Sequence, residues 1–271
     1  MIDWARLQGV YGPAHDVPVL LQAAGNGAKD AWDELWIQLW HQGNTCDAGI
    51  AALPTLASLA QHTNRAVRLP AIELAGEIVG AGLREGRPLK KMKELHQPVA
   101  MLSALADGWL SERPADYRVC FRAKLALDGF PVLSYVLDDF LDFCCDVSCP
   151  QCSDKVSIVI GDYGCYSSIR DWNLGDVHPI PLRPAAPDDL QDAEQGLHHA
   201  AIRDEQPKLA WGLRHVFGDA ECGTCDTTFS VISALEAKRT PSTEFQENTG
   251  AATAPAEHDE GENRHWPAPP F

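Results

Sequence analysis

The stretch SCPQCSDKVSIVI, residues 148–160, joins the pair Cys149 and Cys152 to a run of alternating β-branched residues. Alternation of this kind predicts a short strand. A second Cys-x-x-Cys pair, Cys222 and Cys225, stands in the same way before the run DTTFSVI. Each pair is therefore expected to form a tight turn that leads into a strand.

Two such turns supply four thiolates, which is the ligand set of a closed tetrahedral zinc site. We therefore expect Cys149, Cys152, Cys222 and Cys225 to bind one structural Zn²⁺. Such a site leaves no open position at which a water could be activated. A redox pair of the thioredoxin type is the alternative, but that chemistry places Cys-x-x-Cys at the start of a helix.

The 69 residues between the two pairs are many more than the roughly 15–20 residues usual in a zinc ribbon. We therefore expect an insertion in the ribbon, including a helical part that is broken near Pro207. Cys144, Cys145 and Cys165 lie near enough in the sequence to replace a predicted ligand.

The chain before residue 143 has the pattern of successive helices. Trp32, Trp36 and Trp40 recur every four residues, which predicts one apolar helical stripe that ends before Gly43. Asn64 stands at the N-cap position of a further apolar helix.

A proline followed by aliphatic residues recurs at Pro18, Pro54, Pro98 and Pro131, at separations of 36, 44 and 33 residues. These spacings are close to the two-helix unit of HEAT-type arrays. We expect each proline near the start of the second helix of a pair, where the missing N–H costs no intrahelical bond. A plain helical bundle is the alternative architecture.

The expected fold class is mainly α. A HEAT-like α-solenoid over residues 1–143 is followed by a small α+β zinc-ribbon-like domain over 144–239, in which CDTTFSVISAL is predicted to be a strand. Residues 240–271 hold six acidic residues against one arginine and few aliphatics, which predicts a disordered acidic tail.

Composition narrows the function. The formal charge of −16 disfavours nucleic acid, whose binding depends on phosphate neutralisation, and leaves a nucleic-acid-associated zinc ribbon as a minor alternative. The same charge suits a basic protein partner. No apolar run approaches the roughly 18 residues of a membrane helix. Nine cysteines without a secretory signal indicate a reducing, cytoplasmic location.

No catalytic motif stands out, so we expect a non-enzymatic protein. The alternative is a metal-dependent enzyme with a site in the insertion, residues 153–221, where His198, His199 and Asp204 crowd together. These residues lack the H-E-x-x-H spacing of a metalloprotease.

The opening of the chain resembles that of a bacterial HEAT-repeat family with many actinobacterial members. The resemblance covers residues 4–60 and is carried by VYGPAHDVP and LWHQG. Some members carry a C-terminal Cys-x-x-Cys pair, and some resemble immunity proteins that block a cognate toxin. The resemblance implies a protein-binding role against a basic toxin and brings no catalytic residues with it. This chain departs from the family pattern at Thr45-Cys46 and in its acidic tail.

Overall fold

A computed structural model gives the fold. It describes residues 2–89, 92–142, 144–161, 164–169 and 179–237. The expected acidic tail, 240–271, therefore lies outside the described residues. The expected mainly helical class is confirmed: the described residues form ten α-helices and three small antiparallel sheets.

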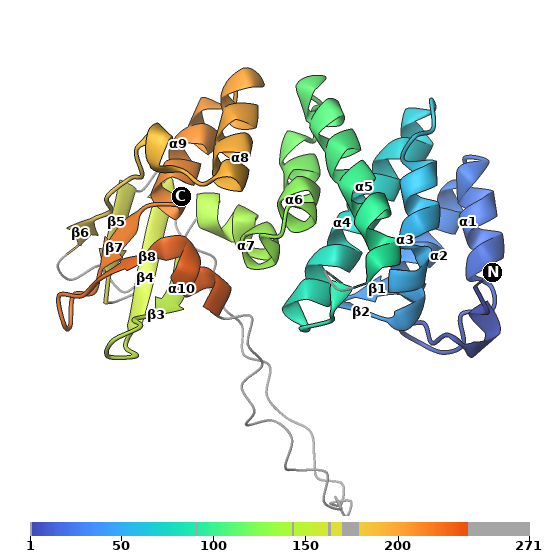
Figure 1. Cartoon of the computed structure of the whole chain (residues 1–271), viewed down its shortest axis with the longest axis horizontal. Helices are drawn as coiled ribbons and strands as arrows, with labels where there is room; N and C mark the ends of the chain where they lie inside the picture. Colours follow the sequence, from blue (N-terminus) through green and yellow to red (C-terminus); the bar gives the residue numbers. More distant parts are fainter. Residues whose placement is uncertain (1, 90–91, 143, 162–163, 170–178, 238–271) are drawn as a thin grey trace, which may run out of the picture. The chain divides into compact units, whose positions relative to one another are not determined.

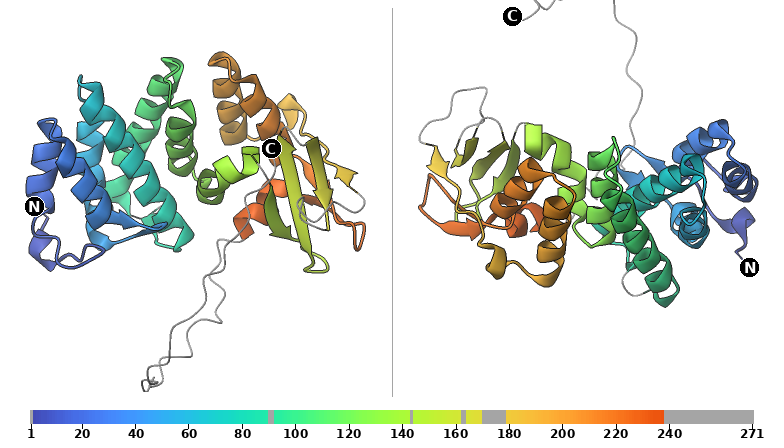
Figure 2. Two further views of the ribbon diagram at one scale, coloured as in Figure 1. Left: turned by 180° about the vertical axis from the view of Figure 1, so that it is seen from behind. Right: turned by 90° about the horizontal axis from the view of Figure 1, so that it is seen from above.

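The first six helices are arranged in pairs, so that α1 packs against α2, α3 against α4, and α5 against α6. Helices α1, α3 and α5 contact one another in sequence on one side, and α2, α4 and α6 do so on the other. Figures 1 and 2 show these helices lying side by side. Their bounds are α1 Val17–Gly25, α2 Lys29–Leu39, α3 Asp47–Leu59, α4 Arg65–Arg84, α5 Lys93–Ser111 and α6 Tyr117–Leu127. A short 3-10 helix, η1 (Trp4–Arg6), precedes them.

Helix starts follow the sequence where a side chain can reach a free amide. The Asn64 Oδ1 accepts the Ala66 backbone N–H at 3.0 Å and so caps α4, as predicted. Asp16 stands at the N-cap of α1 but makes no such bond. Its carboxylate instead lies 3.3 Å from His15 Nε2.

The predicted tryptophan stripe is only partly correct. Helix α2 ends at Leu39, and Trp40 lies on a two-residue strand, β1 (Trp40–His41), that pairs with β2 (Asn44–Thr45). The reversal between the strands uses positive φ angles at Gln42 and Gly43, which turn the chain out of the helical direction.

The prediction that each proline lies near the start of the second helix of a pair is only partly correct. Pro18 and Pro131 do lie in the first turns of their helices, α1 and α7 (Pro131–Asp142), but α1 is the first helix of its pair. Pro54 and Pro98 lie inside α3 and α5, and Pro18, Pro54 and Pro98 all belong to the first helix of a pair. An interior proline costs one backbone hydrogen bond. Burial of the leucines on either side of Pro54 outweighs this loss, because Leu53 and Leu56 are completely buried.

The C-terminal half combines short strands with helices. The strands are β3 Cys145–Ser148, β4 Lys155–Gly161, β5 Gly164–Ser168, β6 Ile180–Pro181, β7 Asp219–Glu221 and β8 Thr228–Ser230. The helices are α7 Pro131–Asp142, η4 Pro187–Asp189, α8 Asp192–Arg203, α9 Pro207–Val216 and α10 Val231–Ala237. Strands β3 to β6 form one antiparallel sheet in sequence order, and β7 pairs with β8. The predicted helical insertion with a break near Pro207 is confirmed by α8 and α9.

The predicted strand over CDTTFSVISAL is wrong beyond Ser230, because the chain continues as α10. Val231 and Leu235 are four residues apart and both completely buried, so a helix places them on one face. The Ser230 Oγ accepts the Ser233 backbone N–H at 3.3 Å, which satisfies an amide at the start of this helix.

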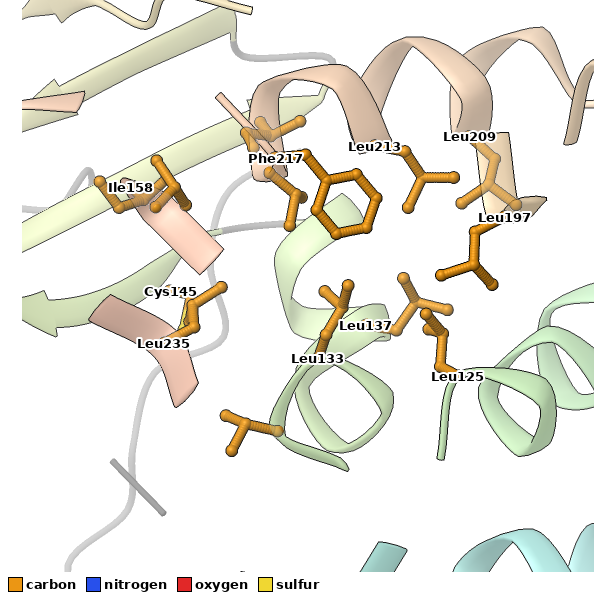
Figure 3. Packing of buried hydrophobic residues seen from close by; sticks show 14 of the residues in the cluster. Leu125, Leu133, Leu137, Cys145, Ile158, Leu197, Leu209, Leu213, Phe217 and Leu235 are labelled. Atoms are coloured by element: carbon orange, nitrogen blue, oxygen red, sulfur yellow. The ribbon is translucent and has the colours of Figure 1, made fainter. Parts of the chain in front are cut away.

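The buried side chains form two hydrophobic clusters. One lies among α1 to α6, and the other joins the end of α5, α6 and α7 to the C-terminal strands and helices. In Figure 3, Leu133 and Leu137 of α7 face Leu213 and Phe217 at the end of α9. Helix α7 thus shares its core with the C-terminal elements, and the expected boundary at residue 143 stays a prediction. None of the helices in the described residues is long and apolar enough to cross a bilayer.

Candidate metal centre

The four predicted cysteines lie together. The sulfur atoms of Cys149, Cys152, Cys222 and Cys225 are all within 4.8 Å of one another. Two of the sulfur–sulfur contacts join the two pairs, at 3.7 Å between Cys149 and Cys225 and 3.7 Å between Cys152 and Cys222. The four cysteines of the cluster are not joined in disulfides. The cluster is therefore compatible with a metal site.

The first pair forms the tip of the β3–β4 hairpin. The Cys149 N–H donates to the Asp154 carbonyl at 2.8 Å, and the Ser153 N–H donates to the Cys149 carbonyl at 2.9 Å. Ser153 has a φ of 65°, in the left-handed region. These two hydrogen bonds close a tight turn, which allows the sulfurs of Cys149 and Cys152 to approach each other.

The second pair repeats this geometry at the tip of the β7–β8 hairpin. The Cys222 N–H donates to the Thr227 carbonyl at 3.0 Å, and the Asp226 N–H donates to the Cys222 carbonyl at 2.9 Å. Asp226, which corresponds to Ser153, has a φ of 56°. Two segments 69 residues apart therefore make the same knuckle, as the shared Cys-x-x-Cys-to-strand pattern predicts.

A backbone junction brings the two hairpins together. Arg183 and Asp219 exchange backbone hydrogen bonds of 2.9 Å in both directions, so β7 pairs with the chain just after β6. The Ser167 hydroxyl on β5 donates to the Glu221 carbonyl at 2.7 Å. Gly218 enters this junction where a side chain would collide with the Arg183 carbonyl. These contacts place the second knuckle, at the end of the insertion, beside the first.

The spacing of the sulfurs fits a tetrahedral ion. Zinc–sulfur bonds of about 2.3 Å at tetrahedral angles imply sulfur–sulfur separations of about 3.8 Å. The two sulfur–sulfur distances that join the pairs, each 3.7 Å, agree with that value. An all-sulfur donor set favours zinc or another thiophilic metal over magnesium or calcium.

The thiol pKa values differ between the two knuckles. Hydrogen bonds from the Thr227 hydroxyl and backbone N–H lower the pKa of Cys225 to about 7. The Asp154 backbone N–H lowers the pKa of Cys152, but burial and hydrogen bonds with the other three thiols outweigh it and raise the pKa to about 12. Thr227 was not anticipated from the sequence; the only signal was a hydroxyl residue two positions after the second cysteine of its pair.

The three alternative cysteine ligands do not belong to the cluster. Cys145 is buried on β3 in the hydrophobic core, and Cys165 lies on β5 opposite Ile160. Cys144 lies between α7 and β3. Burial raises the pKa of Cys165 to about 11, which is typical of a packed thiol.

The two histidines of the enzyme alternative, His198 and His199, lie within α8, and Asp204 directly follows it; they do not form a metal site. Asp204 is buried, and its carboxylate accepts hydrogen bonds from the Tyr117 hydroxyl at 2.9 Å and from the Arg203 guanidinium at 2.6 and 2.8 Å. Burial lowers the pKa of His198, and its neighbour His199 is exposed. Within the described residues, the four cysteines are the only group of three or more His, Cys, Asp or Glu side chains placed to hold a metal ion. The non-enzymatic assignment stays a prediction.

No protein-family model matches the chain, and no curated protein or solved structure matches it. The resemblance to HEAT-repeat proteins therefore stays a prediction. The fold and site by themselves define a mainly helical protein with a four-cysteine cluster between two β-hairpins.

Proposed function

We propose that the four cysteines bind one structural Zn²⁺ and that the protein is a non-enzymatic, HEAT-like protein that binds another protein. The main support for the zinc site is that four sulfurs from two knuckles lie within 4.8 Å of one another. The two knuckles have the same backbone hydrogen bonds. Four thiolates fill a tetrahedral zinc shell, so the ion would serve stability and not catalysis.

The surrounding elements explain why an ion is useful here. Strands β7 and β8 have three residues each and β6 has two. Such short strands bury little apolar surface, and a metal that ties their tips together contributes folding free energy directly. The ion would hold the β7–β8 hairpin and, through it, α10, which packs against α7.

Zinc content tests the site. The purified full chain is expected to hold one zinc, and Cys149→Ser or Cys222→Ser is expected to lose it together with protease resistance of the C-terminal half. Cys165→Ser is the matched control, because Cys165 lies on β5, in the sheet whose β3–β4 hairpin bears the first knuckle, but outside the cluster. A wild-type chain without bound zinc would contradict the proposal.

The two rows of paired helices support the HEAT-like solenoid. Helices α1, α3 and α5 each carry one of the recurring prolines, Pro18, Pro54 and Pro98, so the sequence repeat coincides with the repeat of helix pairs. Stacked pairs of this kind expose an extended surface for a partner. Tyr11, Ile37 and Tyr135 are exposed in this half of the chain and could contribute apolar contacts there.

The partner we propose is a basic protein, and a toxin is the form that the family resemblance implies. The formal charge of −16 would steer a basic partner and complement it on binding. Inhibition would proceed by occlusion, with acidic side chains covering a basic active site. Nucleic acid is disfavoured by the same charge.

Affinity capture of the intact chain, followed by titration with the recovered protein, tests the binding role. A basic partner that binds with one-to-one stoichiometry, and whose affinity falls as salt is raised, is the expected result. Repeated capture without a stoichiometric partner would contradict it.

We further propose a reducing, cytoplasmic location. The four cysteines that lie close together form no disulfide, and their proximity is compatible with a metal site. Proteins that depend on thiolate ligands suit a compartment in which thiols stay reduced.

A further inference from the structure

The four cysteine ligands differ in their access to solvent. Cys149 and Cys222, the first residue of each knuckle, are 1% and 0% exposed. Cys152 and Cys225, the second residue of each knuckle, are half-buried. Cys149 and Cys222 are therefore closed to a reagent in solution, and Cys152 and Cys225 are the two ligands left for it to reach.

These two accessible sulfurs differ in their hydrogen bonds. The Cys225 sulfur lies 3.2 Å from the Thr227 hydroxyl, which donates to the sulfur once the latter is a thiolate. Asp154 occupies the corresponding position after Cys152, and an ionised carboxylate has no proton to donate. The backbone makes no such difference, because each of these two sulfurs also accepts a backbone N–H, from Asp154 or Thr227.

We propose that Cys152 is the reactive ligand of the metal site, the sulfur that electrophiles and peroxides modify first. This inference rests on the proposed zinc site. Hydrogen-bond donors near a metal-bound ligand tune its electron density, and a thiolate that loses basicity also loses nucleophilicity. The hydrogen bond from the Thr227 hydroxyl lowers the nucleophilicity of the Cys225 thiolate, whereas the Cys152 thiolate has no such bond.

The chemistry with an alkylating reagent is a simple displacement. A lone pair of the Cys152 sulfur forms a bond to the methylene carbon of iodoacetamide, and the carbon–iodine bond breaks to release iodide. The product is a neutral thioether, a much weaker ligand than a thiolate. The ion then keeps three thiolates and dissociates more readily.

A peroxide would act on the same atom. The Cys152 thiolate attacks one oxygen of hydrogen peroxide, the oxygen–oxygen bond breaks, and hydroxide leaves and takes up a proton. The sulfur is oxidised to a sulfenic acid and the peroxide is reduced to water. The site would in this way couple oxidant exposure to metal loss and to opening of the β7–β8 hairpin.

Limited alkylation of the zinc-loaded full chain tests the inference. Zinc content is measured first, less than one equivalent of iodoacetamide is added, labelled cysteines are identified by peptide mass spectrometry, and released zinc is followed with a chromogenic chelator. We expect at least fivefold more label on Cys152 than on Cys225, with zinc release proportional to the Cys152 label.

Two reciprocal variants separate hydrogen bonding from exposure. Thr227→Val removes the hydroxyl at nearly constant shape and should raise labelling of Cys225 to that of Cys152. Asp154→Thr supplies a hydroxyl to the first knuckle and should lower labelling of Cys152 severalfold.

Equal or preferential labelling of Cys225 in the zinc-loaded wild type would overturn the inference and leave the zinc site intact. The inference would also be overturned, with the zinc site intact, if Thr227→Val held zinc and its Cys225 were labelled no more than in the wild type. A wild-type chain without zinc would overturn the proposed site and this inference with it.

Discussion

Gly76 lies where α4 meets α6 and offers a direct test of the helical packing. A Cβ at this position would lie 2.6 Å from both the Cα and the Cβ of Ala123. Carbon atoms in contact are normally about 3.5–4.0 Å apart, so Gly76→Ala would force the two helices apart by about 1 Å.

The expected loss of stability is about 2 kcal/mol. Overpacking of a well-packed core costs about 1–3 kcal/mol, and the upper end applies because neither Ala123 atom can move away by a rotamer change. The higher helix propensity of alanine offsets about 1 kcal/mol of this loss of stability.

Urea unfolding of the zinc-loaded full chain, followed by far-ultraviolet circular dichroism, measures the change. Gly108→Ala on α5 is the matched control, because a Cβ there meets nothing within 4 Å, and it should raise the free energy of unfolding by about 1 kcal/mol. The packing would be refuted if Gly76→Ala were as stable as the wild type while Gly108→Ala behaved as expected.

Three further outcomes follow from buried or capping polar groups. Tyr117→Phe should cost about 2 kcal/mol in urea unfolding at pH 7, because Asp204 loses a buried hydrogen bond to its charged carboxylate; wild-type stability would contradict this. Burial alone would raise the pKa of Asp204, but hydrogen bonds from Arg203 and Tyr117 outweigh it and lower the pKa. That stabilisation is present above the unfolded pKa of about 3.9 and is lost as the pH falls through the folded value, so the wild-type urea midpoint should fall more than that of Asp204→Asn below pH 4; parallel curves would argue against it. Asn64→Ala should lower the unfolding free energy by about 1 kcal/mol, whereas Asp16→Ala, which removes no capping bond, should leave it unchanged; equal effects would be inconsistent with the observed caps.

The proximity of the cysteines could be predicted because its signal is local. Each Cys-x-x-Cys pair is followed within a few residues by its strand, and that pattern alone indicates a knuckle. The route between the knuckles could not be predicted, because it depends on the backbone pairing of Arg183 with Asp219. Side-chain alternation indicates a strand but does not say which distant segment it pairs with.

The errors over helices and strands arose where tertiary packing overrides local preference. Pro54 and Pro98 signal a helix start by themselves, but buried leucines on both sides continue the helix through them. Val231 begins a run whose β-branched residues favour a strand, and the burial of Leu235 on the same side makes it a helix.

The buried contact between Tyr117 and Asp204 shows what single-sequence reasoning misses. The two residues are 87 positions apart, and neither belongs to a motif. The sequence offered Asp204 as a candidate catalytic group because of nearby histidines, whereas in the structure its carboxylate is bound by Tyr117 and Arg203.

X-ray absorption at the zinc edge of the purified full chain would identify the ligands of the proposed metal site. We expect one zinc per chain, surrounded by four sulfur atoms at about 2.3 Å. A shell that contains nitrogen or oxygen ligands, or a chain that holds no zinc, would contradict it.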